Sequence, residues 1–300
     1  MKRLKVLTAT LLIFGLCACS TAPKESEKKM EEQTTTILSK RNTDIHITLT
    51  TPAQKAENGY PLVVMAHGFM GNRDESGNFS GVATMLAEHG IASIRMDFPG
   101  CNDSEESYLN YTLENMQHDV TSSLDYALQQ LDIDESRIGM LGYSMGGRVA
   151  SLYLDQASID TLVLWAPAGS DSLSAMKYMG SEEEIEEKLK AAETDGKAMI
   201  QIWGNDVEVS YDYLKQMKEA KPTESLQRFH GDALIVTGGL DKVVTSDISD
   251  AVIAACTNTS ITAHLEIPAA DHSFGVGYSE NEAIHQLIVE STSNFFIDHL

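Results

Sequence analysis

Basic residues, cysteines and long apolar runs are all scarce in this chain of 300 residues. It carries 22 Lys and Arg against 44 Asp and Glu, a formal net charge of −22 at pH 7. Because this charge would repel nucleic-acid phosphates, no nucleic-acid partner is expected. Four cysteines occur, with no C-x-x-C and no metal-ligand spacing, so no metal site is expected. Cys101 and Cys256, in the body of the chain, are expected to be free thiols.

The most apolar segment lies at the N-terminus, where residues 6–16 follow the basic stretch "MKRLK". This run is too short for a spanning helix, which needs about 20 residues, but it suits the apolar part of a secretory signal. It ends in "LCACS", which resembles a bacterial lipobox with Cys19 as the modified residue. We therefore expect residues 1–18 to be a lipoprotein signal peptide and Cys19 to attach an exported protein to the membrane by lipid. An ordinary signal peptide with incidental cysteines is the alternative.

A polar segment follows, rich in Lys, Glu, Ser and Thr and almost without apolar periodicity. Such a segment buries too little apolar surface to offset the entropy lost on ordering. Residues 19–43 are therefore predicted to be a flexible tether. Residues 44–300 remain, enough for one large α/β domain with a full core.

Short apolar runs alternate with helical patterns through this domain. The runs are "PLVVMAHG", "IASIRMDF", "RIGMLGYS", "TLVLWAPA", "ALIVTGG" and "TAHLEIP". Continuous apolar runs of this length are typical of parallel strands buried on both faces. Residues 112–131 place apolar side chains on one helical stripe, with Thr112 as the predicted N-cap. The alternation predicts an α/β fold with a doubly wound, mostly parallel sheet.

One interval, about residues 168–228, is longer than a single crossover needs. It contains an acidic helix and a predicted hairpin that turns at residues 204–206. Ligands in open α/β sheets bind at the carboxyl ends of the strands, so this insertion would cover the site as a cap. Its methionines and aromatic residues either form its own core or face the ligand. Trp203 and Met179 are the predicted ligand-facing residues.

The stretch "GYSMGG" places Gly142, Ser144 and Gly146 in a G-x-S-x-G spacing between an apolar strand and a helix. In this context a serine lies on a tight strand-to-helix turn that exposes its hydroxyl, while the glycines avoid clashes. The spacing alone often arises by chance. The strand before it and the helix after it favour a nucleophile.

A nucleophilic serine needs a base, and the base needs an orienting acid, in the chain order Ser, Asp, His. Asp241 follows the apolar run "ALIVTGG", and His272 follows the next run, so both are predicted at the same sheet edge as Ser144. Asp271 is a poorer orienter because adjacent side chains point apart, and Asp171 is a weaker alternative acid.

Acyl transfer also needs two donors for the oxyanion, and each is worth roughly 10²–10³ in rate. The backbone N–H groups of Phe69 and Met145 are the candidates. Phe69 belongs to "HGFMGN", in which His67 is expected to hold the loop and Gly68 to let the backbone turn an amide toward the site.

Together, "HGFMGN", "RMDFPGCNDS", "GYSMGG", "GGLDKVV" and "ADHSFG" resemble the α/β-hydrolase superfamily, over about residues 45–300. More narrowly they resemble its bacterial cinnamoyl/feruloyl-esterase-like branch, which is related to the serine aminopeptidases. The resemblance implies an eight-stranded, mostly parallel sheet, an inserted cap, no cofactor and a triad on Ser144, Asp241 and His272. Two departures bear on the ester preferred: "PGCNDS" replaces the usual Gly-His-Gly-x-Ser, and Met145 stands where Gln is common.

The leading hypothesis is a serine hydrolase that cleaves small carboxylic esters, of aryl or cinnamoyl type or with short acyl groups, through an acyl-enzyme on Ser144. An aminopeptidase or acyl-peptide hydrolase is the alternative, in which acidic residues 182–187 would grip a substrate amine. A third hypothesis, an inactive binding lipoprotein, is disfavoured by the intact set of catalytic residues. A haloalkane dehalogenase would need Asp as its nucleophile.

Overall fold

The computed structural model describes residues 30–54, 56–202, 204–275 and 282–300. The predicted signal peptide, the predicted lipidation site Cys19 and the predicted pocket residue Trp203 lie outside the described residues. Within the described ranges, no helix combines the length and the apolar character needed to cross a membrane.

The core of the molecule is a sheet of eight strands in the order β1-β2-β4-β3-β5-β6-β9-β10. The strands are β1 (Glu31–Leu38), β2 (Asp44–Thr51), β3 (Tyr60–Ala66), β4 (Ala92–Met96), β5 (Ile133–Tyr143), β6 (Thr161–Trp165), β9 (Asp232–Gly238) and β10 (Ile261–Ile267). β2 pairs antiparallel with β1 and with β4, and the remaining pairs are parallel. The predicted doubly wound, mostly parallel sheet is confirmed.

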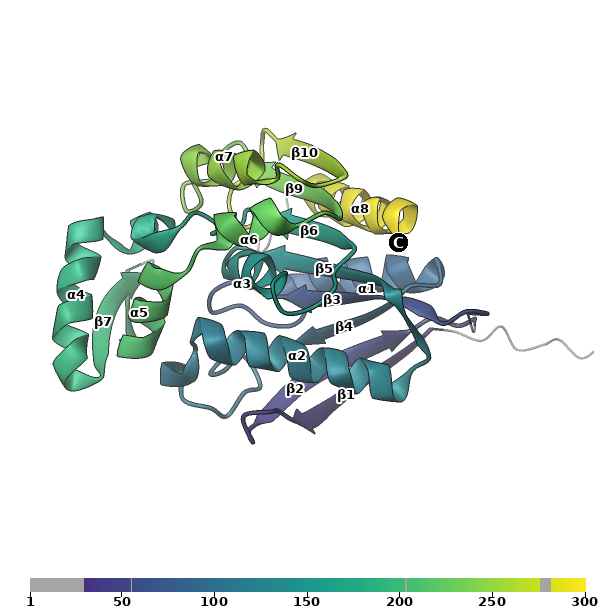
Figure 1. Cartoon of the computed structure of the whole chain (residues 1–300), viewed down its shortest axis with the longest axis horizontal. Helices are drawn as coiled ribbons and strands as arrows, with labels where there is room; N and C mark the ends of the chain where they lie inside the picture. The colour runs from purple at the N-terminus through teal and green to yellow at the C-terminus, as the bar shows by residue number, and fades with distance from the viewer. Residues whose placement is uncertain (1–29, 55, 203, 276–281) are drawn as a thin grey trace, which may run out of the picture.

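Helices cover both faces of this sheet (Figure 1). α1 (Asn78–Glu88) and α8 (Glu282–His299) pack together on one face. The other face carries α2 (Leu113–Gln130), α3 (Met145–Tyr153), α6 (Pro222–Arg228) and α7 (Ser246–Ala255). Every residue of β3, β4 and β6 is buried between these layers, which explains why these strands are mostly apolar and show no alternation of apolar and polar residues. Thr112 caps α2 as predicted, and its side chain accepts from the Asn115 N–H at 3.2 Å.

The prediction that residues 19–43 form a flexible tether is wrong for its second part. Residues 31–38 form edge strand β1, paired along its whole length with β2, so the folded domain begins before residue 44. Most β1 side chains are exposed, and the strand is held by its backbone ladder, which leaves no apolar pattern in the sequence. Arg41, in the turn after β1, adds ion pairs to Asp119 at 2.8 Å and Glu106 at 2.7 Å.

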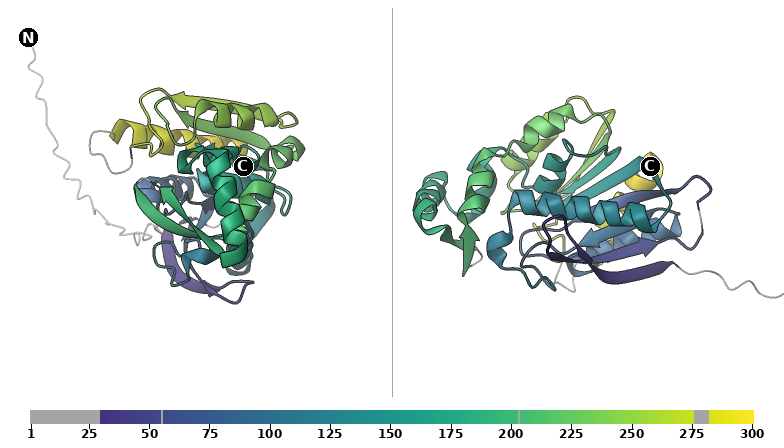
Figure 2. Two further views of the ribbon diagram at one scale, coloured as in Figure 1. Left: turned by 90° about the vertical axis from the view of Figure 1, so that its left-hand side faces the viewer. Right: turned by 60° about the horizontal axis from the view of Figure 1, so that its bottom comes forward.

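The cap stands as a separate lobe beyond the carboxyl ends of the strands (Figures 1 and 2). It consists of η3 (Ser172–Met179), α4 (Glu182–Asp195), the hairpin β7 (Lys197–Ile202) and β8 (Asn205–Ser210), and α5 (Tyr211–Glu219). The predicted range 168–228 extends too far, because α6 packs on α3 and α7 and belongs to the sheet layer. We use "cap" below for residues 172–219.

Candidate active site

Ser144 lies on a strained turn between β5 and α3. Its backbone has φ 52° and ψ −111°, a conformation that costs a residue with a side chain about 1–3 kcal/mol. Two backbone bonds hold the turn: the Ser144 N–H donates to Trp165 O at 2.8 Å, and Ser144 O accepts from Ala168 N at 3.0 Å. A Cβ at position 146 would lie 1.9 Å from Ala66 O, so only glycine lets α3 start this close to β3. The turn therefore presents the Ser144 hydroxyl at the sheet edge.

Three side chains meet at this edge in a hydrogen-bonded relay. Ser144 Oγ lies 3.0 Å from His272 Nε2, and His272 Nδ1 lies 2.8 Å from Asp241 Oδ2. Because the Asp241 carboxylate can only accept, Nδ1 of His272 is assigned the proton and Nε2 is free to accept from the serine. The other oxygen, Asp241 Oδ1, accepts from the Val243 and Val244 N–H groups at 2.8 and 2.9 Å. The arrangement fits proton transfer from serine to imidazole.

Tyr143, the residue before the serine, also holds the imidazole in place. Its hydroxyl donates to the backbone oxygen of His272 at 2.9 Å, and the two ring centroids are 5.3 Å apart. Tyr143 was not predicted to be a functional residue, although it stands inside the G-x-S-x-G motif. The motif identifies the position of Tyr143, but it says nothing of the hydrogen-bond partner His272, which lies 129 residues away in the chain.

The loop after β3 passes directly beside the serine. A Cβ at Gly68 would lie 3.4 Å from Ser144 Cβ, and Phe69 lines the same cavity as Ser144. Fully buried His67 donates from Nδ1 to Gly68 O at 2.8 Å and accepts from the Phe98 N–H at Nε2, at 2.9 Å. Burial lowers the pKa of His67 to about 4, so the ring stays neutral with one tautomer. His67 therefore holds the loop, as predicted from the sequence.

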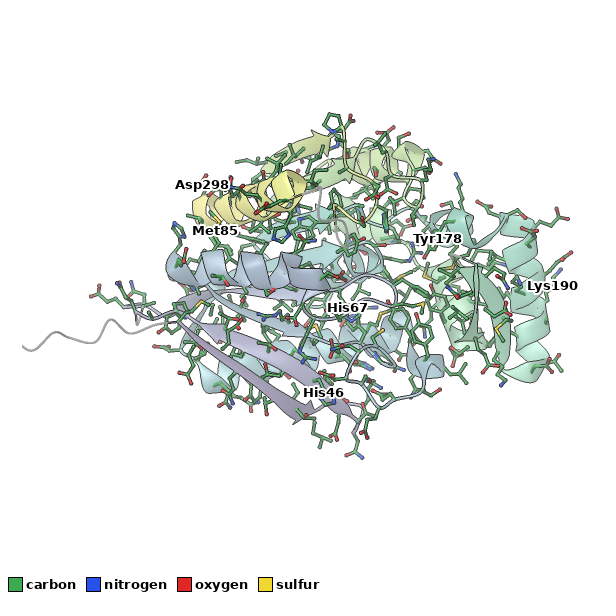
Figure 3. All side chains as sticks on the ribbon, turned by 180° about the vertical axis from the view of Figure 1, so that it is seen from behind. His46, His67, Met85, Tyr178, Lys190 and Asp298 are labelled. Carbon is green, nitrogen blue, oxygen red and sulfur yellow. The ribbon has the colours of Figure 1, made fainter. Side chains whose placement is uncertain are left out.

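A cavity of about 660 Å³ opens over the relay. Its lining comprises Phe69, Tyr143, Ser144, Tyr178, Leu240, Lys242, Val243, Asp271, His272 and Ser273. Tyr178 comes from the cap and lies where the cap meets the body, whereas Lys190 lies on the outer side of the cap (Figure 3). Met179 was predicted to face the ligand, but it is 4% exposed in the core and its neighbour Tyr178 lines the cavity instead. Met145 is likewise buried outside the lining, so its side chain forms no wall of the cavity.

The alternative acids are engaged elsewhere. Asp171 accepts from the backbone and hydroxyl of Thr223, at 3.1 and 2.7 Å, and so fixes the start of α6. Asp271 Oδ1 accepts from the backbone and hydroxyl of Ser273, at 3.0 and 2.6 Å. No residue of the acidic helix α4 is among the described residues that line the cavity. In the described part of the chain, no cluster of three or more His, Cys, Asp or Glu is arranged to hold a metal ion.

Comparisons with known proteins agree with this architecture. The family model described as "alpha/beta hydrolase fold" matches residues 61–186. The protein Est1E from Butyrivibrio proteoclasticus, solved with bound ferulic acid, is 20% identical with a TM-score of 0.64, covering 86% of this chain and 98% of its own. The esterase EaEST from Exiguobacterium antarcticum is 17% identical with a TM-score of 0.60, covering 87% of this chain and 100% of its own.

A relative from Escherichia coli, an uncharacterized 31.7 kDa protein of the traX-finO intergenic region, is 23% identical over 80% of this chain and 92% of its own length. With the sheet order and the strand-to-helix turn at Ser144, the comparisons show that the chain has the α/β-hydrolase fold.

Proposed function

We propose that the protein is a serine hydrolase of small carboxylic esters. The observation that carries the proposal is the relay from Asp241 through His272 to Ser144, which ends at the floor of an open cavity. A structural serine at a sheet corner would need neither a histidine at hydrogen-bond distance nor a carboxylate that fixes the tautomer of that histidine.

In this mechanism, Ser144 Oγ attacks the ester carbonyl carbon while His272 Nε2 takes the hydroxyl proton. The tetrahedral intermediate carries an oxyanion, for which the N–H groups of Phe69 and Met145 are the proposed donors. The C–O bond to the alcohol then breaks, and His272 returns the proton to the leaving oxygen. Water, activated by the same imidazole, attacks the acyl-enzyme and releases the acid. Asp241 stabilises the imidazolium in both halves of the reaction.

The cavity supports an apolar acyl or aryl group of modest size. Its volume of about 660 Å³ lies within the range of small-molecule sites. Aromatic and aliphatic side chains from three parts of the fold line it: Phe69, Tyr178 and Val243. The structural likeness to Est1E, solved with ferulic acid, makes esters of aromatic acids such as methyl ferulate one class to test.

The decisive experiment compares the wild type with Ser144→Ala on p-nitrophenyl acetate and butyrate. We expect turnover by the wild type and a loss of at least about 10³-fold in kcat for the variant. Methyl ferulate, longer acyl esters and aminoacyl p-nitroanilides then separate aryl esterase, acyl esterase and aminopeptidase activity. A wild type that hydrolyses nothing and takes no fluorophosphonate label would refute the proposal and favour a binding protein.

We further propose that Cys19 attaches the protein by lipid to the outer side of the cell membrane. The support is the lipobox-like "LCACS" and the short apolar run before it. Metabolic labelling with an alkyne fatty acid in a bacterial host checks the modification. Label should enter the full chain and be absent from Cys19→Ala, whereas equal labelling of both would contradict it.

A further inference from the structure

Glu75 is a buried carboxylate beneath the loop that carries Phe69. It starts the short helix η1 (Glu75–Gly77) and is 7% exposed. Among the described residues, no Lys, Arg or His lies within ion-pair distance of its carboxylate. Burial raises the pKa of Glu75 to about 7. A buried acid without a cation is costly, so its retention needs a local reason.

That reason lies in the bonds made by Gly68. The Gly68 N–H donates to Glu75 Oε1 at 2.7 Å. The Gly68 carbonyl accepts from His67 Nδ1 at 2.8 Å and from the Gly71 N–H at 3.0 Å. Both polar groups of Gly68 are therefore fixed from one side of the loop.

The bonds to the Gly68 carbonyl determine where the next amide points, and the bond from the Gly68 N–H to Glu75 fixes the peptide unit before it. The peptide unit that joins Gly68 to Phe69 is planar, and in the trans form its N–H points opposite to its C=O. No cis peptide bond occurs in the described residues. Because the Gly68 carbonyl is turned toward His67 and Gly71, the Phe69 N–H is turned the other way. Gly68 itself lies against Ser144, so this amide belongs to the wall of the reaction site.

The loop does not hold this shape by backbone preference alone. Met70, Glu75 and Ser76 have φ of 55°, 42° and 52°, in the left-handed region that residues with side chains rarely adopt. Strain of this kind persists only where surrounding contacts outweigh it. Gly71 leaves room for the acid, since a Cβ there would lie 2.4 Å from Glu75 Oε1.

We propose that Glu75 is a positioning residue, whose buried carboxylate aims the Phe69 N–H at the oxyanion of the tetrahedral intermediate. The inference rests on the proposed hydrolase function. Since the oxyanion exists only after attack, a misdirected amide weakens binding of the transition state and not of the ester. Loss of Glu75 should therefore lower kcat and leave KM nearly unchanged.

The experiment compares Glu75→Ala, Glu75→Gln and Asp74→Ala in the full chain, on p-nitrophenyl butyrate. Asp74 is the matched control, because its half-exposed carboxylate pairs with Arg95 at 3.0 Å and leaves Gly68 untouched. Titration with a fluorophosphonate counts the active sites, and kcat is expressed per active site. A variant that folds less completely therefore does not show a lower kcat for that reason alone. We expect kcat to fall about 10- to 100-fold in Glu75→Ala, because one misplaced donor costs up to 10²–10³.

Glu75→Gln should stay within about fivefold of the wild type, since its amide oxygen can accept the same bond. A trifluoromethyl ketone, which forms a tetrahedral oxyanion adduct with the serine, should lose affinity in Glu75→Ala by a factor similar to the loss in kcat.

Three results would overturn the inference. Glu75→Ala could keep its kcat per titrated site, it could keep full affinity for the ketone, or Glu75→Gln could lose as much kcat as Glu75→Ala. In each of these cases the wild type remains active and the proposed hydrolase stands. A wild type inert to esters and to the fluorophosphonate would refute the hydrolase, and the role of Glu75 with it.

Discussion

The catalytic edge, meaning the loops that follow β3, β5, β9 and β10, differs from the cap in how its side chains are held. At the edge, buried polar groups are fixed by several hydrogen bonds each. The carboxylate of Asp241 has three donors, and the ring of His67 uses both nitrogens. The cap contributes Tyr178 to the cavity, and its buried apolar residues, such as Met176 and Tyr213, belong to one hydrophobic cluster with the core of the body.

A buried arginine makes several of the hydrogen bonds between the cap and the body. Arg148, on α3, is fully buried, and burial lowers its pKa to about 10. Its guanidinium donates to the backbone oxygens of Ala168, Ser170, Ser172 and Met217, at 3.0, 2.6, 3.4 and 2.9 Å. It therefore binds the entry to the cap and, through α5, its last helix. The ion pair of Lys177 with Asp247 is half exposed and contributes little.

This comparison assigns different tasks to the two regions. The catalytic edge holds its polar groups at hydrogen-bond distance from one another, as proton transfer and oxyanion stabilisation require. The cap offers apolar surface, which tolerates replacement as long as volume is kept. Changes at the edge should therefore affect kcat, and changes in the cap should affect KM and substrate range.

The largest effect is expected at the edge, from Asp241→Asn. An amide at this position can favour the wrong tautomer of His272, with the proton facing the serine, so kcat should fall about 10⁴-fold. Steady-state kinetics on p-nitrophenyl butyrate give the value. Asp271→Asn is the control, since the Asp271 side chain accepts from Ser273 through Oδ1 and an asparagine oxygen can accept the same bonds, so kcat should stay within a few-fold. Equal losses in the two variants would show that Asp241 does not orient the base.

The next effect should appear at the junction with the cap, from Arg148→Met. The substitution removes four donors and leaves buried carbonyls unpaired, so the free energy of unfolding should drop by about 2–3 kcal/mol. Proteases should also cut the cap faster, while kcat per active site stays near that of the wild type. Urea unfolding and limited proteolysis measure these changes. The control is Arg137→Met, because Arg137 is 37% exposed; if it lost as much stability, Arg148 would have no special role.

A smaller effect, confined to acid pH, is expected from His67. Its pKa is about 4 in the folded protein against 6.5 for the free side chain, so the unfolded chain binds a proton first. The stabilisation is thus complete above pH 6.5 and is lost as the pH falls toward 4, by about 3 kcal/mol at most. Urea unfolding of the wild type and His67→Gln at pH 7.5 and 4.5 tests this.

The wild type should lose more stability than His67→Gln over this interval. Taking the difference removes the contribution of Glu75, whose raised pKa acts in the opposite direction. Parallel pH slopes for the two proteins would mean that His67 is not kept neutral by burial. His89→Gln, at an exposed position on the surface, should follow the wild type.

Sequence motifs and the spacing of apolar residues predicted much of the fold, because a motif or a spacing depends on a few neighbouring residues only. The buried strands β3 to β6 and β9, the N-cap Thr112, and the turn at Ser144 all carry local signals of this kind. The residues of the relay could be named because parallel strands end at one edge and the chain order limits the choice. Edge strand β1 was missed because exposed side chains leave no apolar pattern.

What the sequence by itself determined is the alternation of strand and helix, the turn that exposes Ser144, and the order in which Ser144, Asp241 and His272 follow. What only the tertiary structure decided is which polar residues are buried. Glu75 and Arg148 belong to residue types that are mostly exposed, and nothing beside them in the chain marks them as different. Glu75 accepts from the Gly68 amide, and Arg148 donates to backbone oxygens near both ends of the cap. These charged side chains are buried because segments distant in the sequence pack around them. Features that depend on neighbouring residues can therefore be predicted from the sequence. The burial of a polar side chain cannot, because it depends on how distant segments pack.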